Sequence, residues 1–385
     1  MLPDDRRRRL AAYRAATKVL SRGPADATVG PGLSALAAGA ATVHDLDDST
    51  DEYGNGIVEV LERRVAALLG FPAAVYFPTG TMAQQVALRC WAGRTGNPVV
   101  ALHPLAHPEL HEDESLTMVC GLRTIHTTDA PRLPTPAEVR GIGDSFGTLM
   151  LELPLREAGF VLPTWDELVA TVAAARDREV MVHLDGARLW ECTAHFDRDL
   201  AQIAGLADSV YVSLYKSLGA ISGAVLAGPQ SLADEARVWR HRYGGLPYQQ
   251  YPAVVSALLG LERELPRLPS YVAQARMVVE VVRQELARSV PWFRVVPDVA
   301  HTHQFKVWLA YEADVLREAG VSQAEDTGVL FFRNWWSSGP GAPPGIAVTE
   351  VTVGSPSLDW TRDDVRAAVG DFVRRLPGPR AQPRP

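Results

Sequence analysis

The sequence predicts an α/β protein, with a large domain built on a mainly parallel sheet and a small C-terminal α+β domain. Short, continuously apolar segments of strand length alternate with helical patterns over the first two thirds of the chain. Strands that are apolar on both faces are typical of a parallel sheet covered by helices on both sides. A long amphipathic stretch, Ser270 to Ser289, then separates this region from a shorter one with two strands and a final helix.

Composition excludes several classes of protein. The chain has 385 residues, of which 47% are hydrophobic, and this is enough for the cores of two or three domains. The net charge of −7 includes no basic surplus, so we expect no nucleic-acid partner. No apolar run is long enough to span a bilayer, and no apolar segment follows the basic N-terminus, so we expect no membrane segment or signal peptide. Three scattered cysteines suit a reducing cytoplasm.

The predicted elements follow one another in a regular order. Residues 1–45 are expected to form an N-terminal arm with a helix, residues 46–268 the large domain, residues 269–376 the small domain and residues 377–385 a tail. Strands are expected at Ala73–Phe77, Val99–Leu102, Gly147–Leu151, Val180–Leu184, Ser209–Leu214, Gly223–Ala227, Phe305–Leu309 and Thr349–Val353. Helices are expected at Asp5–Leu20, Ile57–Leu69, Met82–Trp91, Trp165–Arg176, Asp234–His241, Ser270–Ser289 and Arg362–Leu376.

Three polar segments follow predicted strands, where ligands bind in open α/β sheets. The first, Thr79-Gly80-Thr81, lies between a strand and a helix. Free N–H groups and the positive end of the helix dipole favour an anion there, although an ordinary capping turn has the same pattern. The segment matches neither a nucleotide P-loop nor a dinucleotide motif.

The second segment contains Asp185, which ends an apolar strand. A carboxylate there is costly unless it has a positive partner, and a protonated pyridine nitrogen is one such partner. The paired ring is then an electron sink. The alternative is an aspartate that caps the next turn and pairs with Arg188.

The third segment runs from Ser213 to Ala220 and contains Lys216. Burial lowers the pKa of a lysine, which helps its amine to form an imine with an aldehyde. The chain has only three lysines, Lys18, Lys216 and Lys306, since arginine carries nearly all the positive charge. The alternative is a surface lysine. One aromatic, phosphorylated aldehyde, pyridoxal 5′-phosphate (PLP), would explain all three segments together.

Longer stretches that contain these segments resemble one enzyme family. The stretches beginning DEYGNGIVEV, HLDGARLWE and SLYKSLGAISG resemble the threonine aldolase and β-eliminating lyase family, from about Asp51 to about Leu258. The resemblance implies the aspartate-aminotransferase-type fold of PLP enzymes (fold type I), with a mainly parallel seven-stranded sheet. It also implies an amino-acid substrate and a homodimer or homotetramer.

The resemblance implies a role for each matching residue. Lys216 matches the lysine that carries PLP, and Asp185 matches the partner of its pyridine nitrogen. His107 matches a histidine that stacks on the ring and serves as a base. The remaining matches concern the phosphate and the substrate: Gly80 and Thr81 for the phosphate, Arg188 for the substrate carboxylate, and Tyr53 and Gly54 near the active site. Ser213, in the segment that holds Lys216, is also expected to contact the cofactor.

The sequence departs from the family pattern at three positions that concern the substrate. Leu155 stands where a histidine handles the substrate β-hydroxyl, Glu350 aligns loosely with a late arginine, and Tyr248 replaces a phosphate-binding arginine. His103, His107, His111 and Glu112 have a spacing that suits a metal, but Pro104 and Pro108 interrupt the helix and no metal site is expected.

The predicted activity is that of a PLP-dependent lyase. Aldol cleavage of a β-hydroxy-α-amino acid to glycine and an aldehyde is the leading hypothesis. The substitution at Leu155 leaves β-elimination, or another reaction at Cα, as an alternative. A PLP-binding protein without turnover is the third.

Overall fold

The computed structural model describes residues 3–23, 26–337 and 345–377, which divide into two compact units. One unit comprises Ser34–Leu268, and the other combines Met1–Leu33 with Pro269–Pro385. The first 33 residues therefore pack with the C-terminal part of the chain, and the change of unit comes before residue 45, where the arm was expected to end. Whether the expected boundaries are those of independently folding domains stays a prediction.

The unit of residues 34–268 is built on a seven-stranded sheet with the order β2-β8-β7-β6-β5-β3-β4. Its strands are β2 (Ala73–Phe77), β3 (Val99–Leu102), β4 (Arg123–His126), β5 (Thr148–Glu152), β6 (Met181–Gly186), β7 (Ser209–Ser213) and β8 (Ala224–Gly228). Only β8 runs against its neighbours β2 and β7, and the other pairings are parallel. The predicted mainly parallel sheet is confirmed. The edge strand β4, which is largely exposed, was not predicted.

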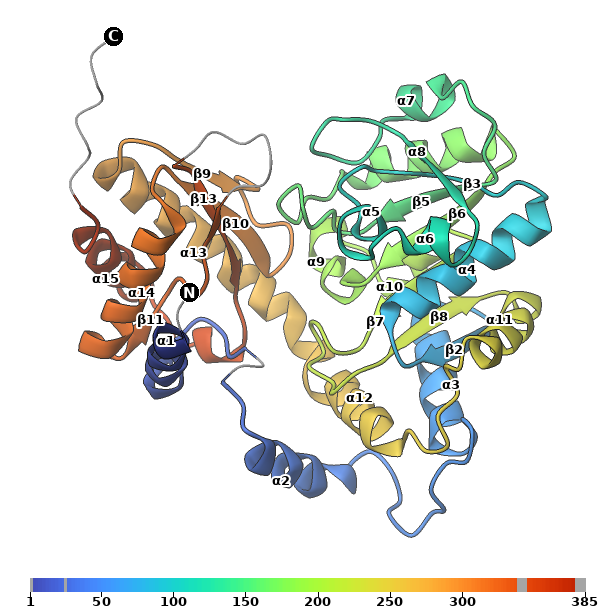
Figure 1. The fold of residues 1–385 in the computed structure, drawn as a ribbon, viewed down its shortest axis with the longest axis horizontal. Helices are drawn as coiled ribbons and strands as arrows, with labels where there is room; N and C mark the ends of the chain where they lie inside the picture. The colour runs from blue at the N-terminus through green and yellow to red at the C-terminus, as the bar shows by residue number, and fades with distance from the viewer. Residues whose placement is uncertain (1–2, 24–25, 338–344, 378–385) are drawn as a thin grey trace. The chain divides into compact units, whose positions relative to one another are not determined.

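Helices cover this sheet. They are α2 (Val29–Ala40), which overlaps the division, α3 (Ile57–Leu69), α4 (Gly80–Thr95), α5 (His107–His111), α6 (Ser115–Met118), α7 (Pro136–Gly141), α8 (Trp165–Arg176), α9 (Thr193–Phe196), α10 (Leu200–Ala204), α11 (Gln230–Arg242) and α12 (Tyr251–Arg263). Figure 1 shows α4 lying along the strands β7 and β8. A buried apolar cluster joins alternate β2 residues to α4 and α11, so these helices cover one face.

Two helices show why the sequence pattern predicts their bounds. The apolar positions of α3 recur every three or four residues, and Gly70 ends it with a φ of 69°. Thr79 caps α4, because its hydroxyl accepts a hydrogen bond of 3.2 Å from the Met82 N–H. The start of α4 is therefore held directly at the end of β2.

The second unit has a four-stranded antiparallel sheet with the order β12-β13-β10-β9. Its elements are α1 (Pro3–Ala15), β1 (Lys18–Val19), α13 (Leu268–Ser289), β9 (Phe293–Val296), β10 (Gln304–Leu309), α14 (Ala313–Thr327), β11 (Val329–Leu330), β12 (Trp336–Ser337), β13 (Ala347–Thr352) and α15 (Arg362–Arg374). The single helix expected over Asp5–Leu20 is wrong: α1 ends at Ala15, because Lys18 and Val19 pair with β11 as a short strand. No helix in the described part of the chain is long and apolar enough to cross a bilayer.

Candidate active site

Three neighbouring strands bring polar side chains together toward one edge of the seven-stranded sheet. Glu152 at the end of β5 pairs in register with Asp185 in β6, and Asp185 pairs with Tyr211 in β7. Side chains at equivalent positions of neighbouring parallel strands point to the same face. Glu152, Asp185 and Tyr211 therefore stand in a row at the carboxyl edge, where α/β sheets bind ligands.

Asp185 is buried, with 2% of its surface exposed. Its Oδ1 accepts a hydrogen bond of 3.1 Å from the Ala187 N–H, so part of the turn-capping alternative is present. The other part, a pairing with Arg188, is absent, because no ion pair to Asp185 occurs among the described residues. Burial raises the pKa of this carboxyl, and the nearby Lys216 ammonium acts against the rise. Among the described residues, the Asp185 carboxylate thus has no cationic group in ion-pair contact.

Lys216 lies beside Asp185, on the segment that follows β7. Burial, followed by the positive charge of Arg188, lowers the pKa of its amine to about 8. The other two lysines are in ion pairs, Lys18 with Asp364 and Lys306 with Glu350. Among the described residues, none forms an ion pair with Lys216. About a tenth of its amine is therefore neutral, and nucleophilic, at pH 7, and about half at pH 8.

The turn before α4 approaches the same row of side chains. A Cβ added to Gly80 would lie 2.0 Å from the Tyr211 hydroxyl oxygen, so only glycine fits there. The side chain of Thr81, the next residue, lies close enough to the Glu112 carboxylate to help lower its pKa. The predicted phosphate segment therefore contacts both β7 and the region of α5.

His107 begins α5 and has a buried partner. Its Nδ1 lies 3.1 Å from Oε1 of Glu112, whose other oxygen accepts a hydrogen bond of 2.9 Å from the Ser115 hydroxyl. Burial alone would raise the pKa of Glu112, but the contacts with His107, Ser115 and Thr81 outweigh it and lower this pKa. The carboxylate fixes the orientation of the His107 ring, which was expected to stack on the cofactor.

Glu152 is a site residue that was not singled out from the sequence. Its carboxylate accepts hydrogen bonds from the backbone N–H groups of His107 (2.8 Å) and Arg156 (3.1 Å). Burial and the neighbouring Asp185 raise its pKa to about 7. The sequence contains a signal for this residue: Glu152 ends an apolar strand, as Asp185 does, and so belongs to the same sheet edge.

Arg188 and Ser213 have buried polar atoms without partners. Nε of Arg188 has no hydrogen bond in the described structure, and its guanidinium lies 5.2 Å from the Phe160 ring centroid. The Ser213 hydroxyl lies near that of Tyr211 but outside hydrogen-bonding geometry. Buried polar groups without partners are rare and indicate that a ligand supplies the missing bonds.

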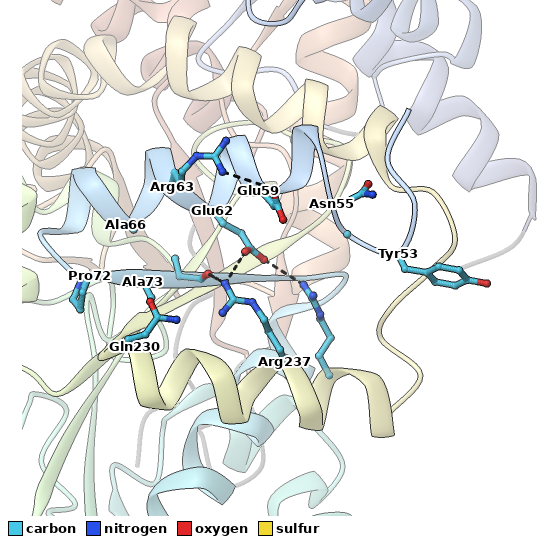
Figure 2. Close-up of a pocket in the computed structure, with 13 residues that line it drawn as sticks. Tyr53, Asn55, Glu59, Glu62, Arg63, Ala66, Pro72, Ala73, Gln230 and Arg237 are labelled. Atoms are coloured by element: carbon cyan, nitrogen blue, oxygen red, sulfur yellow. Dashed lines mark hydrogen bonds and ion pairs between the residues drawn. The ribbon is translucent and has the colours of Figure 1, made fainter. Parts of the chain in front are cut away.

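Tyr53 is not brought into this cluster. Its ring is 60% exposed and packs edge-on against that of Tyr248, with centroids 5.3 Å apart. Tyr53 and Gly54 line another pocket, of about 480 Å³, whose lining includes none of the residues around Lys216. In Figure 2 the Tyr53 ring points away from Glu62 and Arg237. These contacts do not bring Tyr53 to the residues around Lys216, so its role in substrate binding stays a prediction.

The three departures from the family pattern have structural explanations. Leu155 is 1% exposed and forms an isolated bridge with Val161, which makes it part of the apolar core. Glu350 pairs with Lys306 at 3.4 Å across strands β13 and β10. Tyr248 is exposed, and its hydroxyl donates a hydrogen bond of 3.3 Å to Glu52. None of these three residues supplies the histidine or arginine side chain that the family pattern has at its position.

The sheet, its strand order and the lysine and aspartate at its carboxyl edge define a fold type I PLP enzyme. The chain belongs to the β-eliminating lyase family, whose pattern matches residues 28–304. This family consists of PLP-dependent lyases. The predicted family, fold class, enzyme class and cofactor are thereby confirmed.

Individual relatives agree with this assignment. The chain is 26% identical to the low-specificity L-threonine aldolase 1 of Arabidopsis thaliana over 71% of this chain and 77% of that protein. It is 28% identical to the low-specificity L-threonine aldolase of Escherichia coli K12 over 61% of this chain and 72% of that protein. A crystal structure from Listeria monocytogenes, described as a candidate L-allo-threonine aldolase, is 31% identical with a TM-score of 0.85 and covers 96% of this chain and 99% of that one.

A second crystal structure, from Exiguobacterium, is 34% identical, with a TM-score of 0.85. It covers 96% of this chain and all of that one, and it is described as a candidate aromatic amino acid β-eliminating lyase or threonine aldolase. The description of the Exiguobacterium structure thus names two reactions, β-elimination and aldol cleavage, whereas that of the Listeria structure names only the aldolase.

The residues present fit PLP. Lys216 offers a partly neutral amine to an aldehyde, and the buried Asp185 carboxylate lacks an ion-pair partner within the described residues. The close approach at Gly80 leaves free N–H groups at the start of α4 for a phosphate. Among the described residues, Ser213 Oγ and Arg188 Nε have no hydrogen-bond partner, and the charge of Arg188 acts on Lys216.

Proposed function

We propose that the protein cleaves a β-hydroxy-α-amino acid to glycine and an aldehyde. The observation that carries the proposal is the pair formed by Lys216 and Asp185 at adjacent strand ends, with Arg188 beside them. The similarity to threonine aldolases over most of the chain supports this substrate class. When bound, PLP supplies an aldehyde for the substrate amine and a ring that accepts the electrons of the broken bond.

Each residue of the cluster would have one task. Lys216 would hold the cofactor through its amine. Asp185 would hold a protonated pyridine nitrogen, because a buried carboxylate favours a cation beside it. Arg188 binds the substrate carboxylate through the Nε that has no partner, and so selects which bond at Cα is broken. His107, oriented by Glu112, would lie against the ring.

A second candidate is β-elimination, and the buried Leu155 favours it. A leucine cannot accept the proton of a β-hydroxyl, and this one is enclosed against Val161. Without a proton acceptor near Cβ, loss of a β-leaving group would compete with aldol cleavage.

Product analysis separates the two reactions. Purified protein is incubated with L-threonine, L-allo-threonine and L-phenylserine, and glycine is assayed; in parallel, a β-leaving-group amino acid is assayed for pyruvate and ammonia. We expect glycine from at least one β-hydroxy substrate. Pyruvate and ammonia without glycine would overturn the aldolase in favour of elimination.

Covalent attachment is tested independently of turnover. Borohydride treatment of the PLP-loaded protein should fix the cofactor to one peptide that contains Lys216, found by mass spectrometry. Lys216→Ala should lose the label, and the control Lys18→Ala should keep it. A label that persists in Lys216→Ala would contradict the assignment.

We propose further that the protein is a cytoplasmic homodimer or homotetramer. The three cysteines are free and buried, which suits a reducing compartment. The exposed aromatic pair of Tyr53 and Tyr248 suits a surface that a second copy covers. Sedimentation velocity measures the assembly, and a monomer at micromolar concentration would contradict it.

A further inference from the structure

The loop that follows β5 carries a second acidic residue close to α5. Where Leu155 turns into the core, Glu157 turns toward α5, and its Oε1 lies 3.0 Å from Nε2 of His111. The same oxygen accepts a hydrogen bond of 2.7 Å from the Arg156 guanidinium. The loop therefore holds a histidine on a neighbouring element by a carboxylate that is itself fixed by an arginine.

This His111–Glu157 pair lies next to the predicted cofactor site. The His111 ring centroid is 5.2 Å from that of His107. Glu152 binds the backbone N–H groups of His107 and Arg156 with its two oxygens, and Glu152 is the register neighbour of Asp185. One buried carboxylate thus anchors both elements that carry the pair.

The two histidines of α5 have different surroundings. The two histidine side chains are similarly exposed, 36% for His107 and 40% for His111, but the partner of His107, Glu112, is 2% exposed and the partner of His111, Glu157, is 21% exposed. A stacking ring has to be fixed, while a proton acceptor needs access to substrate and solvent. The Glu157 contact occupies Nε2 of His111 and leaves Nδ1 available.

We propose that His111, oriented by Glu157, accepts the β-hydroxyl proton of the substrate, the task that Leu155 cannot perform. The inference rests on the proposed aldol cleavage. The hydroxyl proton moves to His111, and the O–H electron pair becomes the second bond of the aldehyde carbonyl. The Cα–Cβ bond breaks, and its electron pair stays with the glycine fragment. A proton then returns to Cα, so the products are glycine and the aldehyde. Glu157 is the positioning residue.

The chain offers a matched control for this pair. His126 in β4 makes the same kind of contact with another α5 residue, since its Nε2 lies 3.0 Å from Oε2 of Glu109. Its side chain is 48% exposed and Glu109 is 21% exposed, close to the values for His111 and Glu157. A merely structural histidine–glutamate pair on α5 would behave like this one.

The experiment compares His111→Asn, His111→Gln, Glu157→Gln and the control His126→Asn. For a β-hydroxy substrate that wild type cleaves, we expect kcat to fall about 100-fold or more in both His111 variants, the effect of losing a general base. Glu157→Gln should lower kcat about tenfold, and His126→Asn should leave it within about twofold. Equal losses in the His111 and His126 variants, or no loss in either, would overturn the proposal.

Two readouts do not depend on turnover. The affinity for glycine, from spectral titration of the PLP-loaded protein, should be unchanged in the His111 variants, because glycine has no β-hydroxyl. In NMR spectra, His111 ring signals, assigned by their loss in His111→Asn, should shift more with L-serine than with glycine. Weakened glycine binding or equal shifts would overturn the proposal. If wild type releases no glycine from any β-hydroxy substrate, the aldolase function itself has failed, which is a different outcome.

Discussion

At the scale of single residues, burial acts in opposite directions on the charged groups at the strand ends. It raises the pKa of Asp185 and brings that of Glu152 to about 7, whereas it lowers that of Lys216 to about 8. Each shift favours the neutral form, because desolvation penalises charge of either sign. A neutral amine attacks an aldehyde, and the carboxylates accept a cation readily.

The pKa of Lys216 predicts how PLP loading depends on pH. A lowered pKa means that the neutral fraction rises as pH passes about 8 and is nearly complete a unit above it. The rate of PLP attachment to the apoprotein, followed by visible absorbance, should therefore rise through pH 8 and then level. Arg188→Met removes a positive charge that helps to lower the pKa of Lys216, so the transition should move to higher pH. A wild-type rate that still rises steeply at pH 10 would contradict this.

At the scale of elements, the approach of α4 to the strands depends on one residue type. The helix begins at Gly80, directly over the Tyr211 hydroxyl of β7, while Thr79 caps it. His183, two residues before Asp185 on β6, fixes the same helix through a contact of 2.6 Å between its Nε2 and Gln84 Oε1. Burial lowers the pKa of this histidine to about 3, so it stays neutral and structural.

Two glycines of α4 predict opposite effects of alanine. Gly80→Ala places a methyl group against Tyr211 and should destabilise the protein by about 1–3 kcal/mol, with weaker PLP binding. Gly93→Ala meets no atom within 4 Å and should stabilise the helix by roughly 0.5–1 kcal/mol. Urea unfolding of the apoprotein and spectral titration with PLP measure both. Equal effects at the two positions would show that the close approach is unimportant.

At the scale of the whole molecule, the first residues of the chain belong to the C-terminal unit. Strand β1 pairs with β11, and Ala12, Tyr13, Ala16 and Val19 are buried in a cluster with Val321, Ala324 and Leu330. These contacts join segments about 300 residues apart in the chain. The N-terminal segment is therefore part of a core and does not act as a free arm.

Deleting residues 1–22 should accordingly destabilise the unit that contains residues 269–385. The loss of the buried β1 and α1 side chains should cost at least about 3 kcal/mol in that unit. Calorimetry of the truncated and full chains measures it. Of the residues removed by deleting 1–7, Asp4–Arg7 have exposed side chains, and Arg8, which pairs with Glu318 and Glu325, is kept, so this control should change little. A similar effect of both deletions would contradict the packing role.

The sequence by itself determined the α/β class, the bounds of α3, β2, β3 and α8, and the choice of Lys216 and Asp185 as chemical groups. Periodicity and end signals are local, and a scarce lysine or a charged strand end is visible without a fold. Only the tertiary structure decided that Glu152 joins Asp185, that Glu157 orients His111 and that Tyr53 lies apart. These relations depend on strand order and register, which bring together residues from distant segments.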